Sequence, residues 1–139
     1  MNKHVLTALG IAAVLTFLAF TPPMRELPWT PMRIAGLALG IPSFALWFLA
    51  RKQLGDSFSV RAEARHLVTH GLYSRIRNPI YVFGSLFICA VILFANQPVF
   101  LLVFLVLIPL QIVRARKESR VLEEKFGEEY RNYKKTTWF

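Results

Sequence analysis

The sequence predicts an all-α integral membrane protein with four transmembrane helices and an amphipathic C-terminal helix on the cytoplasmic side. Long uncharged stretches and a one-sided distribution of basic residues carry this prediction. The chain has 139 residues, 55% of them hydrophobic and 18% charged, with a mean hydropathy of +0.43. Soluble domains average about 45–50% apolar and about 25% charged residues. An ordinary soluble domain and a disordered chain are therefore both excluded.

The predicted spans follow from where charged residues are missing. Asp, Glu, Lys and Arg are absent from residues 4–24, 34–50 and 78–113, and a helix crosses a bilayer with about 20 mostly apolar residues. The third stretch is long enough for two helices, separated by a tight turn at Asn96-Gln97-Pro98. Within a single membrane domain, residues 1–139, the predicted spans are residues 4–22, 33–50, 79–95 and 98–114.

The first span has one alternative, a secretory signal peptide preceded by Lys3. Signal peptides end at a small-x-small cleavage site. Here Phe20-Thr21-Pro22-Pro23 follows the apolar run instead, which favours a span.

The basic residues predict the orientation. All but Arg25 and Arg33 of the 17 lysines and arginines lie in the N-terminal tip, in the loop 51–78 or after the last span. By the positive-inside rule, both termini are cytoplasmic; if the source is prokaryotic, the membrane is the inner or plasma membrane. This basic surface attracts anionic lipid headgroups. It therefore explains the net charge of +9 without nucleic acid, which is not an expected partner because no recognition module is visible.

No charged residue lies inside the predicted spans, since Arg33 and Arg114 stand at span ends. This opposes an ion-coupled transporter, which usually needs an intramembrane charge. Pro42 and Pro109 lie inside spans. They either are simply tolerated there or kink the helices and open a cavity for a lipid-like substrate. Gly36, Gly40 and Ser43 lie on one side of the second span, which indicates close helix packing there.

The loop 51–78 ends in two local signals. Gly71 can adopt a positive φ and let the backbone approach a ligand. Asn78-Pro79 is expected to begin the third span, because Asn is a good N-cap and Pro suits the first helical turn. A helix N-terminus there would favour an anionic group such as a carboxylate, although an ordinary capped helix explains the same spacing.

The tail predicts an amphipathic helix over residues 115–135. Every fourth position forms one stripe, Glu118, Leu122, Phe126 and Tyr130. Gly127 interrupts the pattern and is expected to end or kink the helix. A carboxylate on an apolar stripe needs a partner. For Glu118 the partner is either an arginine, such as Arg114 one turn earlier or one from the loop, or a ligand.

Two motifs resemble those of the isoprenylcysteine carboxyl methyltransferase family. Residues 67–84, LVTHGLYSRIRNPIYVFG, are similar to a signature that reads roughly LVTxGxYxxxRHPxYxG. Residues 118–133 are similar to the family's EExxLxxxFGxxYxxY, and residues 54–59, LGDSFS, to a weaker LGxxWS. The resemblance covers residues 54–133, and the phospholipid N-methyltransferases are similar at this level.

The resemblance implies an integral membrane enzyme that uses S-adenosylmethionine, bound between the loop before the last two spans and the C-terminal helix. It implies no Rossmann domain, in agreement with the absence of a G-x-G-x-x-G after a predicted strand. The positions that match the family's cofactor contacts are Val68, His70, Tyr73, Arg77, Asn78, Pro79, Tyr81 and Glu118.

The resemblance also implies methyl transfer to a lipophilic small-molecule or lipid-modified acceptor at the inner membrane face. A carboxylate acceptor is already ionised and needs a cationic anchor. The candidates for this catalytic role are Arg75, Arg77 and Arg114. An amine acceptor must first lose a proton, which His66, His70 or Glu118 could accept. Carboxylate O-methylation is the expected reaction, and phospholipid or amine N-methylation is the alternative.

Three positions depart from the family pattern. Asn78 replaces the histidine of RHP, Ser119 the second glutamate, and Phe58 the tryptophan. Asn can hydrogen-bond a carboxylate but carries no charge. These departures favour, as a further alternative, a non-catalytic membrane protein that keeps the fold. The single cysteine excludes a disulfide framework and a Cys-based zinc cluster. No metal site is expected, and no oligomeric state follows from the sequence.

Overall fold

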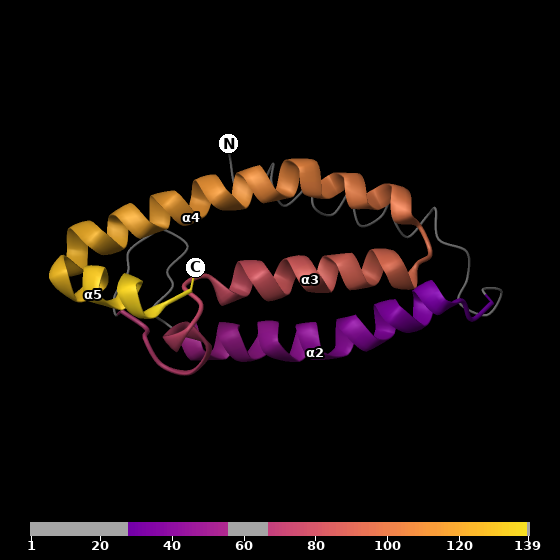
Figure 1. Cartoon of the computed structure of the whole chain (residues 1–139), viewed down its shortest axis with the longest axis horizontal. Coiled ribbons are helices and arrows are strands. Elements are labelled where there is room, and N and C mark those ends of the chain that lie inside the picture. The colour runs from indigo at the N-terminus through magenta and orange to yellow at the C-terminus, as the bar shows by residue number, and fades with distance from the viewer. Residues whose placement is uncertain (1–27, 56–66, 139) are drawn as a thin grey trace.

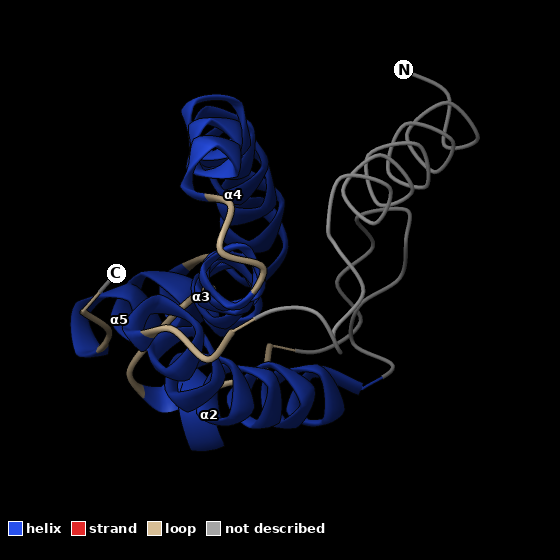
Figure 2. Ribbon diagram, turned by 90° about the vertical axis from the view of Figure 1, so that its right-hand side faces the viewer, coloured by secondary structure: helices blue, strands red, loops and turns tan. Residues whose placement is uncertain are grey.

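A computed structural model describes residues 28–55 and 67–138 of the chain. Within them every regular element is helical and no strand occurs (Figure 2). The predicted first span, 4–22, and the loop residues 56–66, including Phe58 and His66, lie outside the described residues. Figure 1 shows α3 lying between α2 and α4. The elements are α2 (Pro31–Leu54), η2 (Gly71–Ser74), α3 (Pro79–Phe94), η3 (Pro98–Val103), α4 (Phe104–Phe126) and α5 (Glu128–Thr136).

Helix α2 contains the predicted span 33–50 and exceeds it at both ends. Thr30 caps it, because the Thr30 hydroxyl accepts a hydrogen bond from the backbone N–H of Arg33 at 3.2 Å. Arg51 and Lys52 lie in its last turn. Positive charges there stabilise the helix, because its carboxyl end carries a partial negative charge. The helix then ends at Gly55, whose φ is 49°.

Small residues bring α2 and α3 together, as the sequence predicts. Gly36 and Ser43 are buried, and a Cβ added at Gly36 would lie 2.7 Å from the carbonyl oxygen of Ala90. A Cβ at Gly40 would lie 3.3 Å from the Cβ of Ala90. The two helix backbones therefore meet closely along this face.

Arg33 ties the other end of this helix pair. Its side chain is buried, its Nε donates to the carbonyl oxygen of Phe94 at 3.2 Å, and its guanidinium lies over the rings of Trp29 and Phe94. A cation at the carboxyl end of α3 is favourable because the last carbonyls of a helix have no partner within it. The predicted turn follows directly, with Asn96 at a φ of 57°.

The helix does not end at residue 114, where the predicted fourth span ends. Residues 98–103 form the 3-10 helix η3, and α4 then continues without a break through Arg114 to Phe126. Residues 115–126 are rich in Arg, Lys and Glu and lack Gly and Pro, so nothing stops the helix from propagating. Gly127, at a φ of 52°, ends α4 and separates it from α5. The helix predicted over 115–135 is therefore the end of α4 plus α5.

Two of the described helices are long and apolar enough to cross a membrane, Pro31–Leu54 and Pro98–Phe126. Helix α3 is apolar but has only 16 residues. Large apolar side chains on α4, such as Leu105 and Val106, are exposed. Exposed apolar surface of this extent marks a contact with lipid or another partner, so the described part of the chain has the character of a membrane protein.

Candidate functional site

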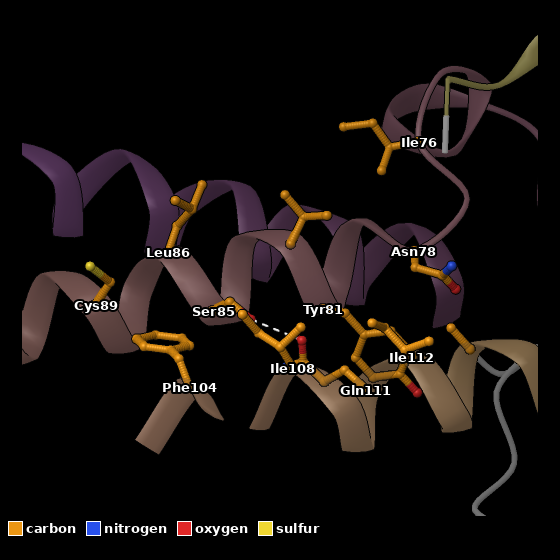
Figure 3. A pocket seen from close by; sticks show the side chains of 12 residues that line it. Ile76, Asn78, Tyr81, Ser85, Leu86, Cys89, Phe104, Ile108, Gln111 and Ile112 are labelled. Atoms are coloured by element: carbon orange, nitrogen blue, oxygen red, sulfur yellow. Dashed lines mark hydrogen bonds between the residues drawn. The ribbon is translucent and has the colours of Figure 1, made fainter. Parts of the chain in front are cut away.

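An open groove of about 510 Å³ lies between α3 and α4 (Figure 3). Such a volume falls within the range of small-molecule sites. Most of its lining is apolar, and its polar side chains are few. The lining residues are Ile76, Asn78, Tyr81, Val82, Ser85, Leu86, Cys89, Phe104, Ile108, Gln111, Ile112 and Ala115.

Tyr81 and Glu118 join the two walls at one end of the groove. The Tyr81 hydroxyl donates to Glu118 Oε1 at 2.5 Å, the short separation expected for a charge-assisted bond. The guanidinium of Arg114 lies close to the same hydroxyl. No ion pair joins Glu118 to Arg114 among the described residues, so the partner of this carboxylate is Tyr81 and not the arginine that the sequence suggested.

Tyr73 lies beside this pair, from the short helix η2. Its side chain is buried, and burial, with Tyr133 and Glu118 nearby, raises the pKa of Tyr73 above its usual range. The ring is therefore neutral over the physiological pH range. Its hydroxyl lies in the electrostatic field of Glu118 and Tyr81. Three predicted cofactor residues from separate elements, Tyr73, Tyr81 and Glu118, thus come together.

Asn78 and Pro79 begin α3 as predicted, but the Asn78 side chain does not cap the helix. No side-chain cap bond forms, whereas the Asn78 carbonyl accepts from the backbone N–H groups of Tyr81 and Val82 at 3.1 and 3.2 Å. The amide of Asn78 instead lines the groove. Pro79 is fully buried beneath it. Asn78 is therefore available to a ligand, and Pro79 serves the packing of the helix.

The three arginines proposed as anchors lie in different surroundings. The Nε of Arg77 is buried and donates to no residue in the described part of the chain. Arg75 is exposed, and its guanidinium lies 5.9 Å from the centre of the Trp138 ring. Arg114 is also exposed. A buried donor without a partner costs free energy, so Arg77 is the arginine whose geometry calls for a bound anion.

Val68, His70 and Gly71 do not join the group formed by Tyr73, Tyr81 and Glu118. Val68 is half-buried and His70 is exposed before η2. Gly71 has the predicted positive φ, 60°. What approaches its backbone is the side chain of Gln53, whose Oε1 accepts from the Leu72 N–H at 2.9 Å. The close approach expected for a ligand is therefore an internal contact with the end of α2.

The C-terminal segment holds the loop before α3 in place. The Tyr133 hydroxyl of α5 donates to the Tyr73 carbonyl at 2.6 Å, and the Trp138 N–H donates to the Arg75 carbonyl at 2.8 Å. These bonds connect residues about 60 positions apart. They fix the backbone that carries Tyr73 and Arg77 beside α4.

Replacing Tyr133 by Phe is expected to loosen this connection. Burial raises the pKa of Tyr133 to about 12, so the folded state holds its proton more tightly than the unfolded chain. This contribution to stability is full below pH ~10 and disappears as the pH rises through ~12. Tyr133→Phe leaves the Tyr73 carbonyl without its donor, lowers the free energy of unfolding by about 1 kcal/mol at neutral pH, and removes this alkaline dependence. Thermal unfolding between pH 7 and 12 measures both effects.

Tyr130→Phe is the matched control, because the Tyr130 hydroxyl bonds Ser119 at 2.8 Å and does not reach η2. Backbone hydrogen exchange in Gly71–Ser74 should accelerate in Tyr133→Phe alone. Equal exchange in the two variants would contradict the role assigned to Tyr133.

Sequence reasoning missed two polar residues of the groove. The Ser85 hydroxyl donates to Gln111 Oε1 at 3.0 Å, across from α3 to α4. Their signal was present, because both are hydrogen-bonding residues inside a long uncharged stretch. A search confined to charged residues and motifs passes over such positions.

One comparison with known proteins gives a match, and the match covers the described site. The model of the phospholipid methyltransferase family matches residues 31–129, a range that contains α2, α3, α4 and the groove between the last two. Comparison with curated proteins and with solved structures found no match. The matched family includes the isoprenylcysteine carboxyl methyltransferases, so the resemblance seen in the motifs is confirmed. The chain belongs to the phospholipid methyltransferase family, whose members are membrane methyltransferases.

Proposed function

We propose that this protein is an S-adenosylmethionine-dependent methyltransferase that acts on a lipophilic carboxylate at the cytoplasmic face of the membrane. The observation that carries the proposal is the buried Arg77 Nε, which has no partner in the described chain. Arg77 directly precedes Asn78, and Asn78 lines an apolar groove. An anion at the end of an apolar chain matches both features. The basic residues around this end, Arg51, Arg75 and Arg114, support a cytoplasmic orientation.

The residues at this end fit S-adenosylmethionine, which carries a carboxylate, an ammonium group, two ribose hydroxyls and a purine. When bound, the cofactor supplies an electrophilic methyl group. Glu118 Oε1 is held by Tyr81, which leaves Oε2 to accept a hydrogen bond from a hydroxyl or the ammonium group. Asn78 offers both a donor and an acceptor. Tyr73 offers a neutral aromatic ring beside them.

The chain's own contribution is positioning and the exclusion of water. A carboxylate acceptor needs no general base, so its orientation is the main requirement. Arg77 is proposed to hold that carboxylate, and the apolar lining, with Val82 and Ile112, to hold its hydrocarbon chain. Burial of the Arg77 Nε strengthens a contact made to it, because little water competes there.

A second candidate function is N-methylation of an amine, as the name of the matched family suggests. Glu118 favours it, since this carboxylate lies at the groove beside Tyr81 and could receive the proton that an amine must lose. His70 is exposed and His66 lies outside the described residues, so Glu118 is the proton acceptor that the geometry supports best.

Transfer of labelled methyl groups to hexadecanoic acid, an S-prenylated cysteine and phosphatidylethanolamine would test these two functions. The proposal expects methyl esters on the carboxylates, which release labelled methanol in base, whereas N-methyl groups do not. Label transferred to phosphatidylethanolamine that base does not release as methanol would favour the amine candidate. Cofactor binding without transfer to any of the three would contradict both and support a non-catalytic role.

Replacing Arg77 by Met is expected to lower kcat/KM for the carboxylate acceptors by about 10²-fold, because a hydrogen bond to a charged group contributes about 1.5–3 kcal/mol. The loss should appear mainly in KM, with the affinity for S-adenosylmethionine unchanged. Arg75→Met is the matched control, since Arg75 is exposed and stacked on Trp138. A loss of cofactor affinity in Arg77→Met would assign the arginine to the cofactor and contradict the anchor role.

A further inference from the structure

The polar pair in the middle of the groove is unexplained by methyl transfer. Ser85 and Gln111 face each other from α3 and α4, one helical turn away from Tyr81 (Figure 3). Apolar residues such as Phe104 and Ile108 lie around them. Four residues of α-helix advance about 6 Å. The pair therefore lies about 6 Å along the groove from the end at which Tyr81 meets Glu118.

The Ser85–Gln111 bond does not satisfy the two side chains that form it. A glutamine amide offers two N–H donors besides its carbonyl oxygen, and a serine hydroxyl keeps acceptor capacity after it donates. The Gln111 side-chain carbonyl accepts a hydrogen bond from the Ser85 hydroxyl. No described residue accepts a hydrogen bond from the Gln111 amide N–H groups. Polar groups in apolar surroundings cost free energy unless they are paired, so this pair favours a ligand with a complementary group.

We infer that the groove selects acceptors that carry an uncharged hydrogen-bonding group, a hydroxyl or a carbonyl, about 6 Å from an end that is methylated beside Tyr81 and Glu118. In an extended chain that distance corresponds to about four to five bonds. This inference rests on the proposed function and names the substrate class for it. A charged group is disfavoured at this depth, because no charged side chain lines the groove and an unpaired charge is costly in apolar surroundings. Ser85 and Gln111 are thus specificity-determining residues.

The competing explanation is that the bond only joins α3 to α4. Interhelical hydrogen bonds between polar side chains are common in membrane proteins and contribute about 0.6–2 kcal/mol. That explanation predicts lower stability on substitution and no change in ligand preference. Ligand preference therefore separates the two explanations.

Cys89 provides a direct reading of groove occupancy. It lines the groove one turn beyond Ser85 and is the single cysteine of the chain. The rate at which N-ethylmaleimide adds to the protein, followed by intact mass, therefore reports this site alone. The probes are hexadecanoic acid, 5-hydroxyhexadecanoic acid and 12-hydroxyhexadecanoic acid, tested on the full chain in detergent. No cofactor and no methyl transfer are needed.

The 5-hydroxy acid should protect Cys89 at about tenfold lower concentration than the other two acids, which corresponds to one added hydrogen bond. Gln111→Leu should abolish this preference while protection by hexadecanoic acid persists. Ser85→Ala should reduce it. The matched controls are Gln97→Leu, at the turn end of α3, and Ser43→Ala, buried in α2, both of which should keep the preference.

Equal protection by the three acids would overturn the inference and leave the pair as an interhelical contact. Absence of protection by any of them would overturn it as well, because the groove would then not hold a chain amphiphile. Failure of the proposed function is a separate outcome. It would appear as selective protection of Cys89 without methylation of the 5-hydroxy acid in the transfer assay.

Discussion

Glu118→Gln is expected to weaken S-adenosylmethionine binding by about 10²-fold, an effect on function as large as that expected of Arg77→Met. The substitution keeps the size of the side chain but removes its charge, and hydrogen bonds to a charged partner contribute about 1.5–3 kcal/mol. Titration calorimetry with S-adenosylmethionine and S-adenosylhomocysteine measures the loss. Both compounds should lose affinity, since both carry the ammonium and ribose groups that Glu118 Oε2 is proposed to bind.

Tyr81→Phe separates the charge of Glu118 from its orientation. The variant removes the hydroxyl that holds Glu118 Oε1 at 2.5 Å and leaves the carboxylate in place. Affinity should therefore fall by about tenfold, less than in Glu118→Gln. Glu124→Gln is the control, because Glu124 is exposed on the same helix. Unchanged binding in a folded Glu118→Gln protein would contradict the assignment of the cofactor to this end of the groove.

The sequence predicted the elements better than their ends. The uncharged stretches located α2, α3 and the beginning of the 98–126 helix, since the need to bury or shield apolar surface fixes such segments. Residue 114 is not a helix end, because the charge boundary at Arg114 reflects a change of surroundings for the helix. The backbone itself stops only at Gly127, where no side chain opposes a positive φ.

The motifs supplied the positions of the candidate site but not the partners of these residues. Motif positions named Tyr73, Tyr81 and Glu118, which the fold brings together from separate elements. Spacing along a helix, however, identifies only neighbours on the same helix. It therefore suggested Arg114, four residues before Glu118, as the partner. The partner that occurs is Tyr81, 37 positions away, and such a pairing depends on how α3 packs beside α4.

Gly36→Ala is expected to produce the largest loss of stability. The new Cβ would lie 2.7 Å from the Ala90 carbonyl oxygen and would also meet the backbone of Phe94. Backbone atoms of a packed helix cannot rotate away as a side chain does, so α2 and α3 must separate. Overpacking of this kind costs about 1–3 kcal/mol, more than the gain of about 1 kcal/mol from replacing Gly by Ala in a helix. Thermal unfolding in detergent measures the balance.

Gly40→Ala is the same substitution one turn along and serves as its control. The new Cβ would lie 3.3 Å from the Cβ of Ala90, a contact that a small adjustment relieves, so the helix-propensity gain should leave stability within about 1 kcal/mol of the parent. Equal destabilisation by both variants would contradict the close backbone contact at Gly36.

The packing at Gly36 also bears on the site at the opposite end of α2. That end supplies Gln53, which accepts from the Leu72 N–H, and Arg51, which lies in the electrostatic surroundings of Tyr73. A displacement of α2 from α3 therefore moves the support of η2, and with it the ring of Tyr73 beside Glu118. Gly36→Ala should weaken S-adenosylmethionine binding although no ligand group lies near it, and Gly40→Ala should not. Because helices transmit rigid shifts along their length, the small-residue face of α2 is a condition for the geometry of the cofactor site as well as for stability.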